Sequence, residues 1–341
     1  MRKNKTGEVL ILSEKEIKSL LMPKKVLELV EQSFSEYSNG NAVNPVKLHL
    51  PLYPHYEGYI NSMPAYLTKL NIAGVKVVSV YKDNMRNHQL PCTMGTILLN
   101  DARSGIPYAL MDGTYITAVR TGAVIGVMAK YLVKNNARAI TIVGSGTQGL
   151  ASFIMIAAAV SGILEARIVD INPQAQDNFI NHASKEFPNV SYVKYDDIQT
   201  ACNGASIIVA AATSPVPLLS NIEFDKGTTV LCVEEDITTK FARRFDCFIS
   251  DFVECFVERT NITNKHHAEM TGEPYEEIAP DDITGEIGDI ITNKIVGRKN
   301  DNDIVLAASV GMGIQDIIVA SYVYERAVIN DIGTIKEFVE I

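Results

Sequence analysis

Residues 139–170 decide the fold of this chain. They begin Ala-Ile-Thr-Ile-Val-Gly-Ser-Gly-Thr-Gln-Gly and end Ala-Arg-Ile-Val-Asp. A β-branched run precedes Gly144, Gly146 and Gly149, an apolar segment of helical length follows them, and a second strand-like run ends at Asp170. The first glycine of such a cluster permits a tight turn, the second lets the backbone approach a pyrophosphate, and the third permits close packing of helix on strand. The pattern predicts a βαβ unit that binds a dinucleotide.

Asp170 bears on which dinucleotide is bound. It lies roughly 20 residues after the glycine cluster, where an acid accepts hydrogen bonds from the ribose hydroxyls. Because a carboxylate repels a 2′-phosphate, we expect NAD(H) rather than NADP(H). A purely structural glycine-rich turn is the alternative, but the flanking strand, the helix and the acid all agree with the dinucleotide interpretation.

The bulk composition describes a globular protein with two domains. The chain has 341 residues, 47% of them apolar, and single cores rarely grow beyond ~250–300 residues. The net charge of −9 argues against nucleic acid and anionic membranes as partners. No apolar run approaches the roughly 18 residues of a membrane helix, and no signal-peptide core follows the basic start. We therefore expect a cytoplasmic protein.

Neither the cysteines nor the histidines predict a metal site. The five cysteines are odd in number, scattered and set mostly among apolar neighbours, which is typical of reduced core thiols. His266, His267 and Glu269 form a cluster, but their spacing fits no familiar ligand pattern. We expect no bound metal.

The N-terminal part of the chain predicts helices followed by a sheet. Ser13 and Glu16 form a capping box, and Pro23 begins an amphipathic helix that ends at Asn39-Gly40. Short extended runs separated by polar turns then indicate an antiparallel sheet. These runs cover residues 46–50, 59–63, 74–81, 96–99 and 107–111.

Two basic residues of this part stand in apolar surroundings. Lys76 interrupts an apolar strand. Either its side chain lies on the solvated face of a half-exposed strand, or it serves the function of the protein. Arg120 lies in a helix predicted over residues 114–134, which is polar mainly at its ends. A buried arginine needs an anionic partner, so Arg120 pairs with an internal carboxylate or with the carboxylate of a ligand.

From residue 139 onward strands alternate with helices, which predicts a doubly wound parallel sheet. Ligands of such sheets bind beyond the carboxyl ends of the strands. Those ends carry Asp170, Thr213 and the run Glu234-Glu235-Asp236. The three acids form a solvated loop, or one of them transfers a proton over the nicotinamide. A last helix over residues 314–330 is expected to return to the N-terminal domain.

Several segments together resemble the ornithine cyclodeaminase/μ-crystallin family over nearly the whole chain. Arg120-Thr121 on the long helix and the Gly144-x-Gly146-x-Gln148 pattern make the resemblance specific. Residues 111–115, 129–132 and 313–316 are most similar to the archaeal alanine dehydrogenase branch. Other segments that carry the resemblance are Gly74-Val75-Lys76, Leu90-Pro91, Asp236, Gly285-Glu286-Ile287-Gly288, Gly297-Arg298 and Ser309-Val310-Gly311.

The resemblance implies an α/β protein of two domains. Residues 126–309 would form a Rossmann doubly wound domain that binds NAD. Residues 1–125 and 310–341 would form an α+β domain for substrate binding and dimerisation, with an amino or imino acid bound in a cleft between the domains. The cofactor-binding residues that it implies are Gly144, Gly146, Thr147, Gln148, Asp170, Val233, Lys240 and Ser309.

The resemblance also implies roles at the substrate. Lys47, Lys76 and Arg120 would bind its carboxylate, so that the Cα hydrogen is aimed at the nicotinamide. Asp236 would be the acid/base residue beside the reacting nitrogen. Asp236 and Lys76 are the two predicted catalytic residues.

Several positions depart from the family pattern. Lys47 stands where ornithine cyclodeaminases usually carry an arginine, although lysine also occurs there in the alanine dehydrogenase branch. Asn61 stands where that branch has an arginine, which weakens a simple assignment to alanine. Glu234 and Glu235 replace small residues. They supply negative charge for a cationic group on the substrate, or they point away from the cleft.

The sequence thus predicts an NAD-dependent enzyme that oxidises an L-amino acid at Cα to an imine with loss of ammonia, like ornithine cyclodeaminase or alanine dehydrogenase. A ketimine reductase or an opine-type amino acid synthase would use the same site in reverse. The rival of another class is a non-catalytic protein that binds NAD(P)H or a small molecule, like μ-crystallin. The expected partners are a small amino or imino acid and a second copy of the chain.

Overall fold

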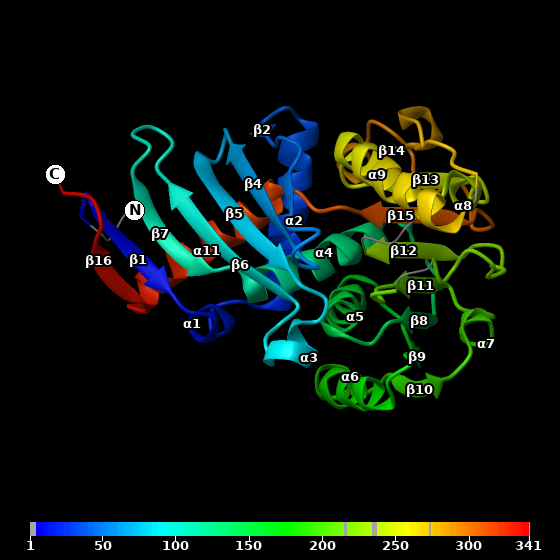
Figure 1. Cartoon of the computed structure of the whole chain (residues 1–341). Helices are drawn as coiled ribbons and strands as arrows, with labels where there is room; N and C mark the ends of the chain where they lie inside the picture. Colours follow the sequence, from blue (N-terminus) through cyan, green and yellow to red (C-terminus); the bar gives the residue numbers. More distant parts are fainter. Residues whose placement is uncertain (1–4, 215–216, 234–236, 273, 341) are drawn as a thin grey trace. The chain divides into compact units, whose positions relative to one another are not determined.

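The computed structural model describes residues 5–340 except 215–216, 234–236 and 273. The chain divides into two compact units, one of Met1–Arg120 with Met312–Ile341 and one of Thr121–Gly311. Each unit is built around its own eight-stranded sheet (Figure 1). No helix within the described ranges combines the length and the apolar character needed to span a membrane.

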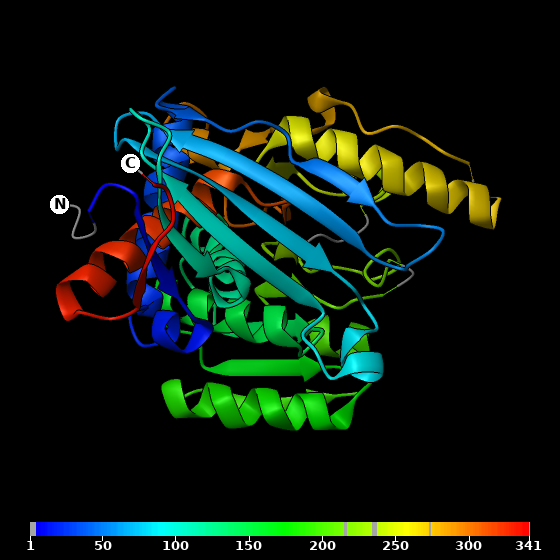
Figure 2. The same ribbon diagram turned by 60° about the vertical axis from the view of Figure 1, so that its left-hand side comes forward.

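The sheet of the first unit has the strand order β16-β1-β7-β6-β5-β4-β2, and β3 also pairs with β4. Figure 2 shows β4, β5 and β6 running side by side. Neighbours from β4 to β7 are antiparallel, as expected, but β1 pairs with β7 in parallel. The expected antiparallel pairing is confirmed for the five predicted runs, and the short run before Ser13 adds a strand that was not predicted. The strands are β1 Glu8–Leu12, β2 Ala42–Val43, β3 Leu48–Pro51, β4 Tyr59–Leu67, β5 Ile72–Val80, β6 Thr93–Asn100, β7 Pro107–Asp112 and β16 Thr334–Glu337.

Helix α11 (Gly313–Asn330) covers one face of this sheet, where it packs on β4, β5, β6 and α2 (Pro23–Ser38). Side chains alternate between the two faces of a strand. The face towards α11 carries the buried apolar residues of the three strands, and Lys76 belongs to the same set by register. These residues are Met63, Ala65, Leu67, Val78, Ile97 and Leu99. The other helices that begin in this unit are α1 Glu14–Lys18, α3 Asn84–His88 and α4 Thr114–Leu132.

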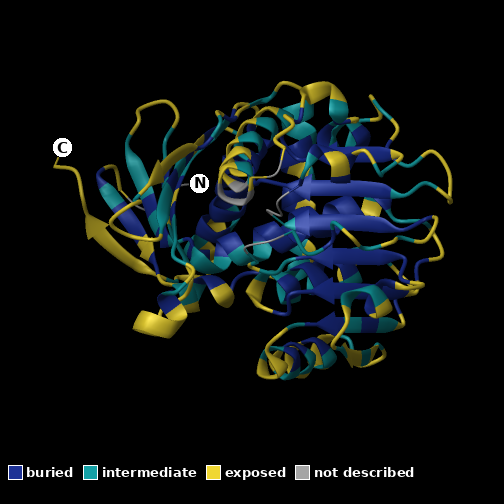
Figure 3. Cartoon of the chain, turned by 45° about the vertical axis from the view of Figure 1, so that its right-hand side comes forward, coloured by how far each residue is buried: buried dark blue, intermediate teal, exposed yellow. Residues whose placement is uncertain are grey.

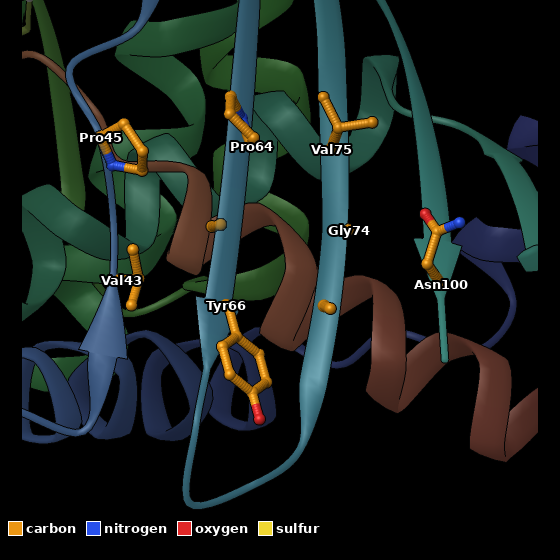
Figure 4. A pocket seen from close by; sticks show the side chains of 9 residues that line it. Val43, Pro45, Pro64, Tyr66, Gly74, Val75 and Asn100 are labelled. Carbon is orange, nitrogen blue, oxygen red and sulfur yellow. The ribbon is translucent and has the colours of Figure 1, made fainter. Parts of the chain in front are cut away.

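The opposite face of the same sheet carries a shallow apolar hollow (Figure 4). In this close-up the lining side chains stand in front of the strands and α11 lies behind them. The labelled residues are Val43, Pro45, Pro64, Tyr66, Gly74, Val75 and Asn100. None of the predicted substrate-binding residues lines the hollow, so it is not the candidate substrate site.

The second unit is a doubly wound parallel sheet, as predicted. Its strand order is β10-β9-β8-β11-β12-β15-β13-β14, and every neighbouring pair is parallel. The chain reverses its direction of winding between β8 and β11, and Figure 3 shows the central strands as buried. The strands are β8 Ala139–Val143, β9 Glu165–Val169, β10 Ser191–Tyr195, β11 Ile207–Ala210, β12 Thr229–Val233, β13 Cys247–Ser250, β14 Gly285–Glu286 and β15 Val305–Ser309.

The helices of the second unit connect these strands. Cys202, Cys232, Cys247 and Cys255 are buried, whereas Cys92 of the first unit is exposed. The connecting helices are α5 Thr147–Ala159, α6 Pro173–Glu186, α7 Ile198–Cys202, α8 Thr239–Ala242, α9 Val253–Thr271, the 3₁₀ helix η1 Pro280–Asp282 and α10 Ile287–Ile291.

Candidate functional site

Lys76 lies buried in the middle of β5. It stands directly across from Met63 of β4 and Ile97 of β6, and its side chain is 0% exposed. The interpretation of Lys76 as a lysine on a solvated face is therefore wrong, because α11 covers the face on which it lies. A buried ammonium group requires a partner of opposite charge.

The partner of Lys76 is Asp316, in the first turn of α11. Lys76 Nζ donates a hydrogen bond to Asp316 Oδ1 at 2.8 Å, and Arg120 Nε donates to the same oxygen at 2.8 Å. The side chain of Asp316 is 0% exposed and that of Arg120 is 7% exposed. Arg120 therefore has an internal carboxylate as a partner, which is the first of the two expected alternatives. Sequence reasoning missed the role of Asp316, although an acid in a largely apolar helix is a signal.

Gln315 extends this group with its side-chain amide. Its Oε1 accepts hydrogen bonds from Arg120 Nη1 and from the backbone N–H of Met312, each at 3.1 Å. Among the described residues, Thr117 Oγ1, Gln315 Nε2 and Asp316 Oδ2 are buried without a hydrogen-bond partner. Since buried polar groups are normally paired, the group has capacity for a polar ligand or for ordered water.

Positive charge exceeds negative charge around Lys76. Burial is the largest cause that lowers the pKa of Lys76, to about 7; Arg120 and Lys47 also lower it, and Asp316 opposes them. Lys47 is itself buried, in the segment before β3. Three cations thus act together with one carboxylate, and such a group favours an additional anion.

Asn61 lies on the same face of the sheet as Lys76. It stands across from Val78, two residues along β5 from Lys76, and it is buried. His49 Nδ1 donates a hydrogen bond to Asn61 Oδ1 at 2.8 Å, and the His49 ring contacts Tyr59. This position therefore holds a neutral amide that His49 orients. Sequence reasoning did not identify His49, since only the pairing of β3 with β4 brings it to Asn61.

The glycine cluster of the second unit has close backbone contacts at two of its three positions. Gly144 has φ +94°, and a Cβ there would lie 2.4 Å from the backbone N of Ala212. A Cβ on Gly149 would lie 2.0 Å from the carbonyl oxygen of Gly144. A Cβ on Gly146 would meet nothing within 4 Å. The first and third glycines are thus required by packing, and the second leaves open space.

That open space lies at the N-terminus of α5. Gly146 is the N-cap residue, and no side chain caps the helix. Thr147 and Gln148 begin the helix, and the buried Gln148 Oε1 has no partner among the described residues. Free backbone N–H groups at a helix N-terminus bind phosphate oxygens, so the residues present fit a dinucleotide.

Asp170 lies beside the glycine cluster, at the end of β9. Its Oδ2 accepts hydrogen bonds from the backbone N–H and the hydroxyl of Ser145, at 2.7 and 2.9 Å. Its Oδ1 accepts from the backbone N–H of Asn172 at 2.9 Å. Two carboxylate oxygens offer about four acceptor positions, so Asp170 is oriented by the loop and keeps capacity for a ribose hydroxyl.

Val233 and Ser309 lie at the same edge of the sheet. They are paired across β12 and β15 at the carboxyl ends of both strands. The buried Asp251 fixes this edge, because it accepts hydrogen bonds from the Ser309 hydroxyl at 2.8 Å and from the backbone N–H of Gly311 at 2.8 Å. Lys240 is exposed on the short helix α8. The structure thus places Val233 and Ser309 together.

The acidic run after β12 falls outside the described residues. Glu234, Glu235 and Asp236 follow Val233 directly. The predicted role of Asp236 and the two alternatives for Glu234 and Glu235 therefore remain predictions. Among the residues whose placement is described, no group of three or more His, Cys, Asp or Glu side chains could hold a metal ion.

A family model matches the chain over almost its entire length. The description of this model is "Ornithine cyclodeaminase/mu-crystallin family", and it covers residues 8–331. The chain belongs to the ornithine cyclodeaminase/μ-crystallin family. The resemblance stated from the sequence motifs is confirmed, and so is the predicted Rossmann-type α/β fold.

Members of this family with different activities are similar to the chain. Δ1-pyrroline-2-carboxylate reductase of Bacillus cereus is 30% identical to this chain. The alignment covers 97% of this chain and 100% of the relative. The structure of the Thermococcus litoralis Δ1-pyrroline-2-carboxylate reductase in complex with NADH and L-proline has a TM-score of 0.86 at 30% identity, covering 96% of this chain and 99% of that one. An archaeal alanine dehydrogenase dimer with bound NAD has a TM-score of 0.86 at 27% identity, covering 97% and 100%.

Proposed function

We propose that the chain is an NAD(H)-dependent oxidoreductase that interconverts an imino acid and the corresponding L-amino acid at Cα. The observation that carries the proposal is the buried group of Lys76, Arg120 and Asp316, to which Lys47 adds a third positive charge. Its excess positive charge suits a carboxylate, the anion that amino and imino acids share. Dehydrogenase and reductase relatives of similar length support this class of reaction.

A cyclic 2-imino acid of the Δ1-pyrroline-2-carboxylate type is the proposed substrate. Relatives named for that activity are 30% identical to the chain in both the sequence and the structure comparison. The neutral Asn61 held by His49 also favours it, since the alanine dehydrogenase branch has an arginine at this position. Oxidation of an L-amino acid with loss of ammonia is the second candidate, supported by the similarity to the archaeal alanine dehydrogenase.

NAD(H) is the proposed cofactor, as in the complexes of the two structural relatives. The open space at Gly146, the uncapped N-terminus of α5 and the remaining acceptor positions of Asp170 fit a dinucleotide without a 2′-phosphate. When bound, NADH supplies the hydride for the reduction. Gly144, Gly146, Thr147 and Gln148 would hold its pyrophosphate, and Val233, Lys240 and Ser309 would hold its nicotinamide half.

The side chains of the first unit would bind and orient the substrate. Lys76 and Arg120 would donate charge-assisted hydrogen bonds to its carboxylate, and Lys47 would strengthen the attraction. A carboxylate held at two points fixes the face that Cα presents, which removes much of the entropic cost of reaction. Asp236 would hold or deliver the proton at the substrate nitrogen, as the family resemblance implies.

We further propose a homodimer that forms through the outer face of the first unit's sheet. Val43, Leu48, Leu50 and Val77 lie on the face opposite Lys76 by register, and Leu48 is 71% exposed. The apolar hollow lies on the same face (Figure 4). Large exposed apolar patches commonly mark protein interfaces, and the archaeal relative is described as a dimer.

The experiment that tests the proposed function measures NADH consumption with Δ1-pyrroline-2-carboxylate. The reverse reaction is measured with NAD⁺ and L-proline, L-alanine or L-ornithine, and ammonia is followed together with nicotinamide absorbance. Reduction of the cyclic imine without ammonia supports the reductase, and ammonia with stoichiometric NADH supports the dehydrogenase. Ammonia without net NADH would indicate a cyclodeaminase. Binding of NADH without any turnover would contradict the proposal.

A further inference from the structure

One oxygen of Asp316 joins two cations from distant parts of the first unit's sequence. Lys76 and Arg120 lie 240 and 196 positions away from Asp316, yet both donate to its Oδ1 at 2.8 Å. An ammonium has three N–H groups and a guanidinium has five. The carboxylate therefore brings both cations to one point and leaves them donors for a further anion.

The backbone that carries Asp316 is fixed against strand β4. The N–H of Ile314 donates to Asn44 Oδ1 at 3.1 Å. A Cβ on Gly313 would lie 2.8 Å from the carbonyl oxygen of Met63, so α11 begins in direct contact with β4. Lys76 stands across from Met63 on the neighbouring strand. The start of the helix and the strand that carries Lys76 are thus held in one arrangement.

The protonation of Lys76 depends on this carboxylate. The groups that act on its pKa come from each packed element: Asp316 from α11, Arg120 from α4 and Lys47 from the segment before β3. The residues directly across on β4 and β6 are apolar. Asp316 alone among these charges favours the ammonium form. An opposite charge at hydrogen-bond distance typically shifts a pKa by about 1–3 units, so without Asp316 the pKa of Lys76 would be lower still and little of the ammonium form would remain at neutral pH.

We infer that Asp316 is a positioning residue, which holds Lys76 and Arg120 as a preformed pair and favours the ammonium form of Lys76 that receives the carboxylate of the substrate. The inference rests on the proposed function for the identity of that anion. Asp316 acts through its two cations. A bound carboxylate favours the ammonium form of Lys76, so binding takes up a proton wherever Lys76 is neutral in the free protein.

Proton uptake on binding of L-proline tests the inference. L-proline and NADH cannot react with each other, so calorimetric titration of the NADH-bound protein in two buffers of different ionisation enthalpy counts the protons taken up. For the wild type, uptake should rise from near zero to near one proton as the pH passes through about 7. For Asp316→Asn, the same rise should occur about 1–3 pH units lower, with affinity for L-proline at pH 7 weaker by roughly tenfold or more.

Three further variants isolate the route through Lys76. Lys76→Met and the double variant Lys76→Met/Asp316→Asn should take up no proton in this range, and their affinities for L-proline should differ less than those of the wild type and Asp316→Asn. Asp316→Glu keeps the charge and should return the uptake curve towards the wild type. The urea unfolding transition of each variant checks folding, because affinity for NADH reports on the second unit alone. If Asp316→Asn alone does not fold, Lys76→Met is compared with the double variant for affinity for L-proline. The loss of Asp316 is better tolerated there, because one buried cation has been removed.

An uptake curve of Asp316→Asn that coincides with the wild-type curve would overturn the inference. Equal losses of L-proline affinity from Asp316→Asn with and without Lys76 would also overturn it. Failure of the proposed function looks different, because the wild type then binds no L-proline at any pH. In that case the inference is decided by urea unfolding of the wild type and of Asp316→Asn without ligand. The quantity compared is the pH above which the free energy of unfolding begins to increase. A shift to lower pH in the variant supports it, and no shift overturns it.

Discussion

Replacing Lys76 by methionine should remove a pH-dependent cost of folding from the first unit. In the folded chain burial, together with Arg120 and Lys47, lowers the pKa of Lys76 from 10.5 to about 7. Between these pH values the unfolded chain binds a proton that the folded chain does not bind, so the free energy of unfolding increases with pH. Below the pKa of the folded chain the buried Lys76 is fully protonated, so its cost to the free energy of unfolding no longer changes with pH.

The size of the effect follows from proton linkage. Each pH unit in this interval changes the free energy of unfolding by about 1.4 kcal/mol. The free energy of unfolding of the wild type minus that of Lys76→Met should therefore increase by about 2–3 kcal/mol between pH ~7.5 and ~9.5. The same difference should stay level below pH ~6.5.

Urea unfolding followed by tyrosine fluorescence measures this difference, because the chain has 14 tyrosines and no tryptophan. Lys69→Met is the matched control in the same unit, since the Lys69 side chain is 67% exposed and loses little hydration on folding. Its difference from the wild type should stay level over the same pH range. A level or decreasing difference for Lys76→Met between pH ~7.5 and ~9.5 would refute the assignment of a neutral Lys76 in the folded chain.

Three other predictions concern the cofactor site and the proposed dimer. Gly149→Ala should lower the free energy of unfolding by at least about 2 kcal/mol, because its Cβ would lie 2.0 Å from a backbone oxygen. The free energy of unfolding of Gly146→Ala, measured in urea, should stay within about 0.5 kcal/mol of the wild type, but this variant should bind NADH at least tenfold more weakly. Asp170→Ser should increase the ratio of kcat/KM for NADPH to that for NADH by about tenfold or more, and an unchanged ratio would contradict the role of this carboxylate. Leu48→Asp should convert the dimer to monomer in light scattering, while a persistent dimer would exclude this face.

Local sequence was sufficient to predict the β8-α5-β9 unit. The three glycines, the strand ends and Asp170 lie within one short stretch, and neighbouring backbone requires glycine at Gly144 and Gly149 and binds the carboxylate of Asp170. The strands β11, β12 and β13 were predictable for the same reason, since buried parallel strands are short apolar runs.

Features that depend on distant parts of the chain could not be predicted. The burial of Lys76 results from α11, and its partner Asp316 is 240 residues away. The strand β16 is exposed at each of its four residues, so only its pairing with β1 defines it. Helix α9 has no clear apolar stripe, and its sequence pattern does not distinguish it from a solvated polar segment.

The first unit contains both ends of the chain, and this affects its folding during synthesis. At translation rates of about 5–20 residues per second, the 196 residues from Arg120 to Asp316 take about 10–40 s to produce. Throughout this interval the nascent sheet lacks the helix that covers its apolar face, and Lys76 lacks its carboxylate. The continuous second unit is complete before α11 leaves the ribosome. The apolar face of the N-terminal strands is therefore uncovered while the second unit is being made, and a premature stop before Met312 leaves a chain that contains the whole second unit but lacks the helix that covers the first unit's sheet.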